Sequence, residues 1–226
     1  TQDLGVDSRI LVTIAAGIFI LPFFLFSSLA GQVVDKNEKS SYISIIKFME
    51  ILLMIMATIG FYFENVLLLM VVLFLMGTQS AFFGPAKYAI LPDLLKEREL
   101  VGGNALVEAG TFLAILLGTI LGGVLIMLEG GAGAVIVSSI LIAMSLLGWM
   151  FSWHIPNARP AVPHLNLNYN ILVETYLMVS YTARRKDVFL SILGISWFWL
   201  VGFTFLSQFP TYAKDVIGGD EMIVTL

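Results

Sequence analysis

The sequence predicts an all-α protein, a polytopic membrane bundle with six transmembrane helices, and three observations lead to this prediction. Of the 226 residues, 58% are hydrophobic and 12% are charged, whereas soluble domains carry about 25% charged residues. Six stretches are apolar and long enough to cross the hydrocarbon core as helices. These stretches do not alternate as membrane strands do. A water-soluble enzyme and a disordered tail are therefore excluded.

The six expected spans differ in the charges that they contain. Two of them carry charged residues: the span 105–128 holds Glu108 one turn inside its start, and the span 41–63 holds Lys47 and Glu50 in its first half. The other four contain no charge and cover residues 10–30, 66–83, 131–153 and 188–209. Each charge inside a span is a candidate for function, because charged groups are costly in lipid.

The basic residues indicate the orientation of the spans. If the first span runs inward, ten of the twelve Lys and Arg residues lie in inner segments, and the opposite orientation places only two there. Positive charge concentrates in cytoplasmic loops of membrane proteins. We therefore expect Lys36, Lys96 and Arg185 on the cytoplasmic side, and short outer turns at 64–65 and 129–130.

The inner segment 154–187 is the longest connection. Three prolines keep its first ten residues extended. Leu172, Tyr176 and Val179 then recur at helical spacing and are followed by three basic residues, 184–186. This pattern predicts either an amphipathic helix on the inner membrane surface or a plain linker whose basic end only sets the topology.

The remaining composition excludes several classes of chemistry. The formal net charge of −4 argues against nucleic-acid binding. Without cysteine there is no disulfide or thiolate chemistry, and His154 and His164 fall in no metal-binding or catalytic spacing. There is no glycine-rich nucleotide loop. We therefore expect no metal, no cofactor, no enzyme activity and no ATP-driven pump in this chain.

The first inner loop carries a compact charged pattern, G-Q-V-V-D-K-N-E-K, from Gly31 to Lys39. It resembles G-x-x-x-D-R/K-x-G-R/K-R/K, the loop signature of the major facilitator superfamily. Gly31, Asp35, Lys36 and Lys39 match the signature, whereas Glu38 stands in place of a glycine and the last base is absent. The resemblance implies a conformational latch at the four matching residues. The alternative is an ordinary positive loop that only sets topology.

Further stretches carry the same resemblance. Gly118, Gly122 and Gly123 are similar to the fifth-helix pattern G-P-x-x-G-G, with threonine in place of proline, and small residues four apart allow close helix packing. The run F-G-P-A-K-Y-A-I-L-P-D-L-L and the later N-A-L-V-E-A resemble the lysophospholipid transporter branch of this superfamily. The run R-R-K-D-V-F-L-S-I-L-G-I-S-W-F-W resembles the members fused to acyltransferase and acyl-carrier-protein synthetase domains.

The resemblance implies how the chain is organised. Thr1 is not an initiator methionine and a new apolar run begins at Met222, so we expect a fragment that covers helices two to seven of twelve, with a further helix starting at the C-terminus. Residues 1–153 would be the remainder of the N-terminal bundle. Residues 154–187 would be the inter-bundle loop, and residues 188–226 would begin the C-terminal bundle.

The resemblance also implies a function. We expect a secondary transporter that moves lysophospholipid, chiefly lysophosphatidylethanolamine, across the bacterial inner membrane by alternating access, so that it can be reacylated. Its partners would be this substrate, membrane lipids and an acyltransferase or acyl-carrier-protein synthetase, fused or separate. Two alternatives stay open: a proton-coupled small-molecule or drug carrier, and a membrane anchor for a fused acyltransferase.

Lys87 is the leading candidate for binding the substrate. Pro85 and Pro92 bracket it, so we expect an irregular segment that turns its ammonium toward a cavity, where it could bind a phosphate. The alternative is a lysine that extends to the membrane interface. Glu108 could pair with Lys87, bind a substrate ammonium, or favour the positive end of its helix.

The other polar candidates are more ambiguous. Lys47 and Glu50 lie three residues apart on one helical face, which predicts an internal ion pair more than a substrate site. Gln79 and Gln208 could line a cavity but are better suited to bridging helices. Trp197 either faces lipid or forms part of the wall around an acyl chain.

Overall fold

The structure is a computed structural model that describes residues 8–128 and 132–215. The described residues form helices and connections, without strands. The long helices are α1 (Ser8–Lys36), α2 (Lys39–Tyr62), α3 (Val66–Ala89), α5 (Leu100–Ile126), α6 (Ala132–Ser152) and α8 (Lys186–Asp215). The short ones are α4 (Leu91–Leu94), the 3-10 helix η2 (Glu97–Glu99) and α7 (Ile171–Ala183). The expected outer turn at 129–130 and the run from Met222 lie outside the described residues.

The predicted all-helical membrane bundle is confirmed. Within the described residues, five helical segments are long and apolar enough to cross a membrane, and they correspond to most of α1 and to α2, α3, α5 and α6. The sixth expected span, 188–209, lies inside the continuous helix α8. Each expected span therefore coincides with one long helix.

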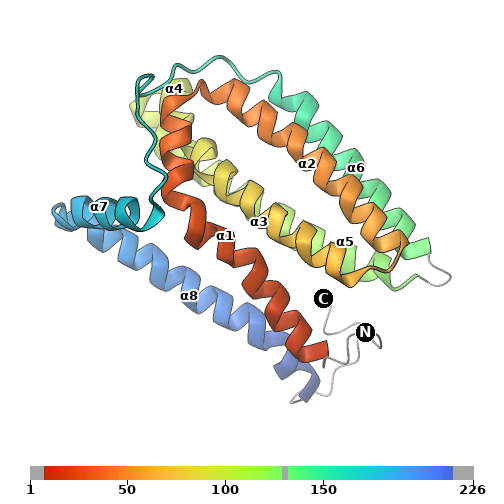
Figure 1. Cartoon of the computed structure of the whole chain (residues 1–226). Helices are drawn as coiled ribbons and strands as arrows, with labels where there is room; N and C mark the ends of the chain where they lie inside the picture. The colour runs from red at the N-terminus through yellow and green to blue at the C-terminus, as the bar shows by residue number, and fades with distance from the viewer. Residues whose placement is uncertain (1–7, 129–131, 216–226) are drawn as a thin grey trace.

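The helices pack in an order that differs from their order in the chain. Figure 1 shows α1, α3, α2 and α6 next to one another, with α7 lying across the inner end of α1 and leading into α8. The main contacts run from α1 to α3, from α3 to α2, from α2 to α6 and from α6 to α5. The middle of the bundle is therefore occupied by α2 and α3.

Large apolar side chains cover the outside of the bundle. Phe24, Leu67 and Leu106 are each more than 70% exposed, and α5 has no buried residue. In water this surface would be strongly unfavourable, since about 25 cal/mol is lost for each Å² of exposed apolar area. The exposed apolar surface fits a protein that is dissolved in lipid.

A short turn, predicted to lie on the outer side, joins α2 to α3. Glu64 adopts a positive φ of 51°, and the Asn65 side chain accepts a hydrogen bond of 2.9 Å from the Leu68 amide, which caps α3. The connection occupies residues 63–65 only, so the expected short turn at 64–65 is confirmed.

Two helices are longer than the sequence predicts. α1 continues through Gly31 and Asp35 to Lys36, so the expected nine-residue loop is reduced to Asn37 and Glu38. α3 continues through Pro85 to Ala89, so the expected irregular segment around Lys87 is wrong. A membrane helix tolerates a proline because neighbouring groups satisfy the carbonyl that the ring leaves without a partner.

A small apolar core lies at the end of the bundle that is predicted to be cytoplasmic, which is called the inner end. Val34 of α1, Ile43 of α2, and Ala86 and Ile90 at the end of α3 pack together with Ala158 from the connection that follows α6. Each is at most 5% exposed. The core thus joins four segments that are far apart in the sequence.

The helix predicted in the long inner connection is present as α7 (Ile171–Ala183). Asn170 caps it by accepting a hydrogen bond of 3.2 Å from the Val173 amide. Leu172, Tyr176 and Val179 are all more than half exposed, so the apolar face predicted from their spacing is open. Its position on the inner membrane surface stays a prediction.

Candidate functional site

Lys87 lies in the last turn of α3 and faces α5. Its ammonium donates a hydrogen bond of 3.2 Å to the hydroxyl of Thr111 and lies 4.7 Å from the centre of the Tyr88 ring. Among the described residues it forms no ion pair with a carboxylate. Among the residues that the structure describes, its charge is thus balanced only by a hydroxyl and a ring face, both of which are weak partners for a cation.

Glu108 is on the same side of α5 as Thr111, three residues earlier. Its carboxylate accepts a hydrogen bond from the Tyr88 hydroxyl, and the expected pairing of Glu108 with Lys87 is not found among the described ion pairs. Lys87, Tyr88, Glu108 and Thr111 together are called the α3–α5 cluster. They bring one cation, one anion and two hydroxyl groups between the ends of two helices.

An aromatic contact lies next to this cluster. Phe112, which follows Thr111 on α5, stacks on Trp199 of α8 with the ring centres 5.6 Å apart and an angle of 16° between the planes. Trp197 is 68% exposed, so the tryptophan that reaches α5 is Trp199 and not the one that the sequence singled out. Gln208 falls within α8, but its side chain lies outside the described residues.

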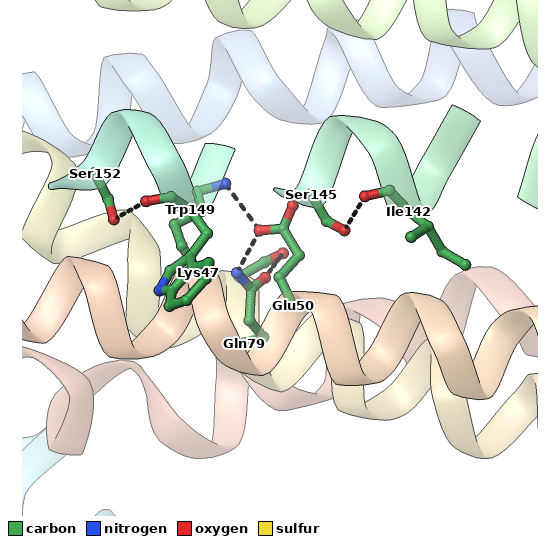
Figure 2. Close-up of polar contacts among 8 residues, drawn as sticks. Lys47, Glu50, Gln79, Ile142, Ser145, Trp149 and Ser152 are labelled. Carbon is green, nitrogen blue, oxygen red and sulfur yellow. Dashed lines mark hydrogen bonds and ion pairs between the residues drawn. The ribbon is translucent and has the colours of Figure 1, made fainter. Parts of the chain in front are cut away.

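A second polar cluster lies between α2 and α3, and Figure 2 shows it. The Lys47 ammonium lies 2.8 Å from the Glu50 carboxylate, which confirms the predicted internal pair. The Gln79 amide donates a hydrogen bond of 3.0 Å to the same carboxylate oxygen from α3. Lys47 also lies 4.7 Å from the centre of the Phe83 ring. Lys47, Glu50 and Gln79, called the α2–α3 cluster, therefore link two helices, and Gln79 acts as a bridge.

The face of α6 that covers this cluster is lined by small residues. Ser138, Ser145 and Ser152, seven apart, are each at most 5% exposed. The hydroxyls of Ser145 and Ser152 donate to carbonyl groups of α6 itself (Figure 2). A Cβ on Gly148 would lie 3.6 Å from the Lys47 side chain. The small face lets α2 approach α6 and leaves room for the lysine stem.

The four latch candidates have different surroundings. Lys39 is buried, and its ammonium lies 2.6 Å from the carboxylate of Asp93 on α4. Asp35 is exposed, and no hydrogen bond or ion pair of its side chain occurs among the described residues. Lys36 ends α1, and a Cβ on Gly31 would meet nothing within 4 Å. Gly31 therefore makes no close helix contact within the described part of the chain.

The glycines predicted for helix packing face open space. A Cβ on Gly118 or Gly122 would meet nothing within 4 Å, and Gly123 lies on the same helix, α5. No described helix packs against the first two. Their packing role stays a prediction for a partner outside the described residues.

Several residues of these clusters were missed by sequence reasoning. Thr111 and Tyr88 were given no role, although Thr111 follows Glu108 by three residues and thus shares its helical face. The sequence contains no pattern that predicts the pairing of Asp93 with Lys39, because the two residues are 54 positions apart. Among the described residues no group of three His, Asp or Glu side chains could hold a metal ion.

The apolar helices and the charges between them define a polytopic membrane protein. The chain belongs to the Major Facilitator Superfamily, whose sequence pattern matches residues 1–226. It is therefore part of a transporter family and a multi-pass membrane protein.

Three similar proteins of named function belong to one group of transporters. The lysophospholipid transporters LplT of Citrobacter koseri and of Escherichia coli O1:K1 are each 30% identical over 189 residues, which is 83% of this chain and 45% of the relative. The LplT of an Enterobacter species is 27% identical over 206 residues, which is 89% of this chain and 48% of the relative. The chain spans about half the length of these relatives. No solved structure matches it significantly.

Proposed function

We propose that this chain is part of a transporter that moves a lysophospholipid across the bacterial inner membrane by alternating access. Its similarity to proteins named as lysophospholipid transporters supports the substrate class. The observation that carries the proposal is Lys87, a cation between two membrane helices that no described carboxylate neutralises. The phosphate of a lysophospholipid is the anion that fits it.

Such a substrate needs a polar site for its headgroup and an apolar path for its single acyl chain. Lys87 supplies the charge, and the hydroxyl of Thr111 lies within hydrogen-bonding distance of it. The stacked pair Phe112 and Trp199 supplies apolar surface beside that site. Glu108 would attract the ammonium group of lysophosphatidylethanolamine, the substrate that this proposal favours.

The four latch residues and the other candidates keep roles within this proposal. Lys39, held by Asp93, would stiffen the inner end of the bundle, while Gly31, Asp35 and Lys36 would meet partners in the other half of the protein. Trp197 and Gln208 would contribute to the cavity walls, whereas Gln79 would keep its bridge between α2 and α3. Reacylation would be carried out on the cytoplasmic side by an acyltransferase or acyl-carrier-protein synthetase, fused or separate.

Transport of labelled lysophosphatidylethanolamine by the full-length protein in lipid vesicles tests the proposal. A charge-assisted hydrogen bond contributes about 1.5–3 kcal/mol, so Lys87→Ala should weaken substrate binding about ten- to hundredfold. Lys87→Arg should keep part of the activity, because it keeps the charge. Lys96→Ala, which removes an exposed lysine near the same end of the bundle, is the matched control.

Two outcomes would contradict the proposal. If Lys87→Ala inserts normally and transports at the parent rate, the phosphate site lies elsewhere. If the full-length protein moves no lysophospholipid but supports acyl transfer, the membrane-anchor alternative holds. Transport is measured in vesicles with a proton gradient and in vesicles without one. A difference between the two transport rates would indicate a proton-coupled carrier.

A further inference from the structure

The segment 155–168, called the strap, leaves α6 and runs along the inner ends of α2 and α1 to α7 (Figure 1). Three backbone amides of the strap donate hydrogen bonds to the end of α1 and the start of α2. They are Ala158 to the Glu38 carboxylate at 2.8 Å, Val162 to the Asp35 carbonyl at 2.8 Å, and Asn168 to the Gln32 side chain at 2.9 Å. The strap is therefore attached along its length and does not hang as a free linker.

Glu38 is the centre of this attachment. One carboxylate oxygen accepts hydrogen bonds from the Ser40 amide at 3.0 Å and from the Ala158 amide at 2.8 Å. The other accepts from the Ser41 amide at 2.8 Å and from the Ser40 hydroxyl at 3.0 Å. The same side chain thus caps α2 and binds the strap.

The backbone amide and the backbone carbonyl of Ala158 are both hydrogen-bonded. The carbonyl accepts a hydrogen bond of 3.3 Å from the Lys39 amide, and the residue as a whole is 1% exposed in the inner core. The Lys39 ammonium also donates a hydrogen bond of 3.2 Å to the carbonyl of Arg159. Polar and apolar contacts thus converge on the same point of the strap.

The surroundings keep Glu38 ionised. Burial by itself raises the pKa of its carboxyl group, but hydrogen bonds from Ser41, Ala158 and Ser40 lower that pKa to about 2. A carboxylate accepts charge-assisted hydrogen bonds, which are about twice as strong as neutral ones. The attachment of the strap is therefore present at physiological pH.

Glu38 is also the residue at which the loop departs from the signature pattern, which has a glycine there. A glycine has no side chain to accept these hydrogen bonds. We propose that Glu38 is a positioning residue that docks the strap onto the inner end of α1 and α2, so that the strap moves with these helices and α7 alone connects them to α8.

This docking shortens the effective connection between the two parts of the chain. The strap is held as far as Asn168, and α7 begins at Ile171. With 13 residues, α7 is about 20 Å long. Movement of α8 relative to α1–α3 must then occur at the two ends of α7. This inference rests on the two-bundle organisation and does not depend on which substrate is carried.

Hydrogen exchange on the full-length protein in lipid nanodiscs tests the proposal. Glu38→Ala removes the acceptor of the Ala158 amide, so the amides of Ala158 and Val162, two of those that hydrogen-bond to the end of α1 and the start of α2, should exchange at least about tenfold faster. Glu38→Asp separates the two roles, because aspartate caps helices well but is one methylene too short to reach the strap. It should release the strap and leave the amides of α2 protected. Glu97→Ala, at an exposed glutamate in η2, is the matched control.

A distance measurement completes the test. Asn37 and Ala161 are exposed, and spin labels on cysteines at these positions should show a narrow distance distribution that broadens in Glu38→Asp. If the amides of Ala158 and Val162 stay protected in Glu38→Asp, the docking by Glu38 is overturned. If α2 and the strap loosen together in that variant, Glu38 is only a helix cap and the proposal also fails.

Discussion

Gly77 of α3 lies directly against the Phe19 carbonyl of α1. A Cβ at position 77 would overlap the carbonyl oxygen and would lie 3.1 Å from the carbonyl carbon and 3.2 Å from the ring of Pro22. Pro22 itself is almost completely buried. The closest approach of the two helices that pack most extensively on each other therefore depends on one missing side chain.

Gly77→Ala should destabilise the protein for this reason. The added methyl group must push two backbones apart, and overpacking of this kind costs about 1–3 kcal/mol. The measurement is the unfolding midpoint of the detergent-solubilised protein. Gly84→Ala, on the same helix with nothing within 4 Å of the added Cβ, is the control and should change little. Equal midpoints for the two variants would show that α1 and α3 do not meet as closely as described.

The Lys47–Glu50 pair allows a double-mutant test. Both side chains are largely removed from water, with 22% and 25% exposed, and removal of one partner leaves an unpaired charge beside lipid. Lys47→Met and Glu50→Leu should each destabilise by at most about 3 kcal/mol, while the double variant should recover much of this loss. Unfolding free energies of all four proteins give the coupling. Additive effects would mean that the pair contributes no net interaction.

Asp93 and Asp35 should respond differently to loss of charge. Asp93 pairs with the buried Lys39 at 2.6 Å, so Asp93→Asn should lower the unfolding midpoint. The Asp35 side chain is exposed, so Asp35→Asn should leave stability and expression intact, shift the population toward the inward-open state and slow transport. Cysteine cross-linking between the two halves of the full-length protein reports the population. An unchanged population in Asp35→Asn would leave that residue as a topology signal only.

Docking of the strap should weaken in acid. The pKa of Glu38 is lowered from 4.5 to about 2, so its contribution is fully present above pH 4.5 and is lost as the pH falls toward 2. The charged residues next to it are Lys39 and Arg159. The distance distribution between labels at 37 and 161 should therefore broaden between pH 4.5 and 2 in the parent. A parent distribution that stays narrow down to pH 2 would contradict the acid dependence, and Glu38→Ala should show no further change.

The approximate positions of the helices could be predicted from the sequence, but their ends could not. The span expected at 66–83 continues to Ala89, because a helix interior in lipid tolerates Pro85 when its neighbours satisfy the backbone. The loop expected from Gly31 to Lys39 shrinks to two residues because α1 continues to Lys36. Hydropathy predicts which residues lie in the hydrocarbon core of the membrane. The hydrogen-bonded helix can continue beyond the edge of that core.

The sequence by itself determined that this protein is a membrane bundle and where its charges enter the bilayer, because each span must be apolar over its own length. It also determined local pairs such as Lys47 with Glu50, which are three residues apart on one helix. Only the tertiary structure decided that Lys87 meets Thr111 and not Glu108, and that Glu38 binds an amide 120 positions away. These partners depend on how each helix is rotated and on which helix it packs against. The residue pattern of a single segment predicts neither the rotation nor the packing partner.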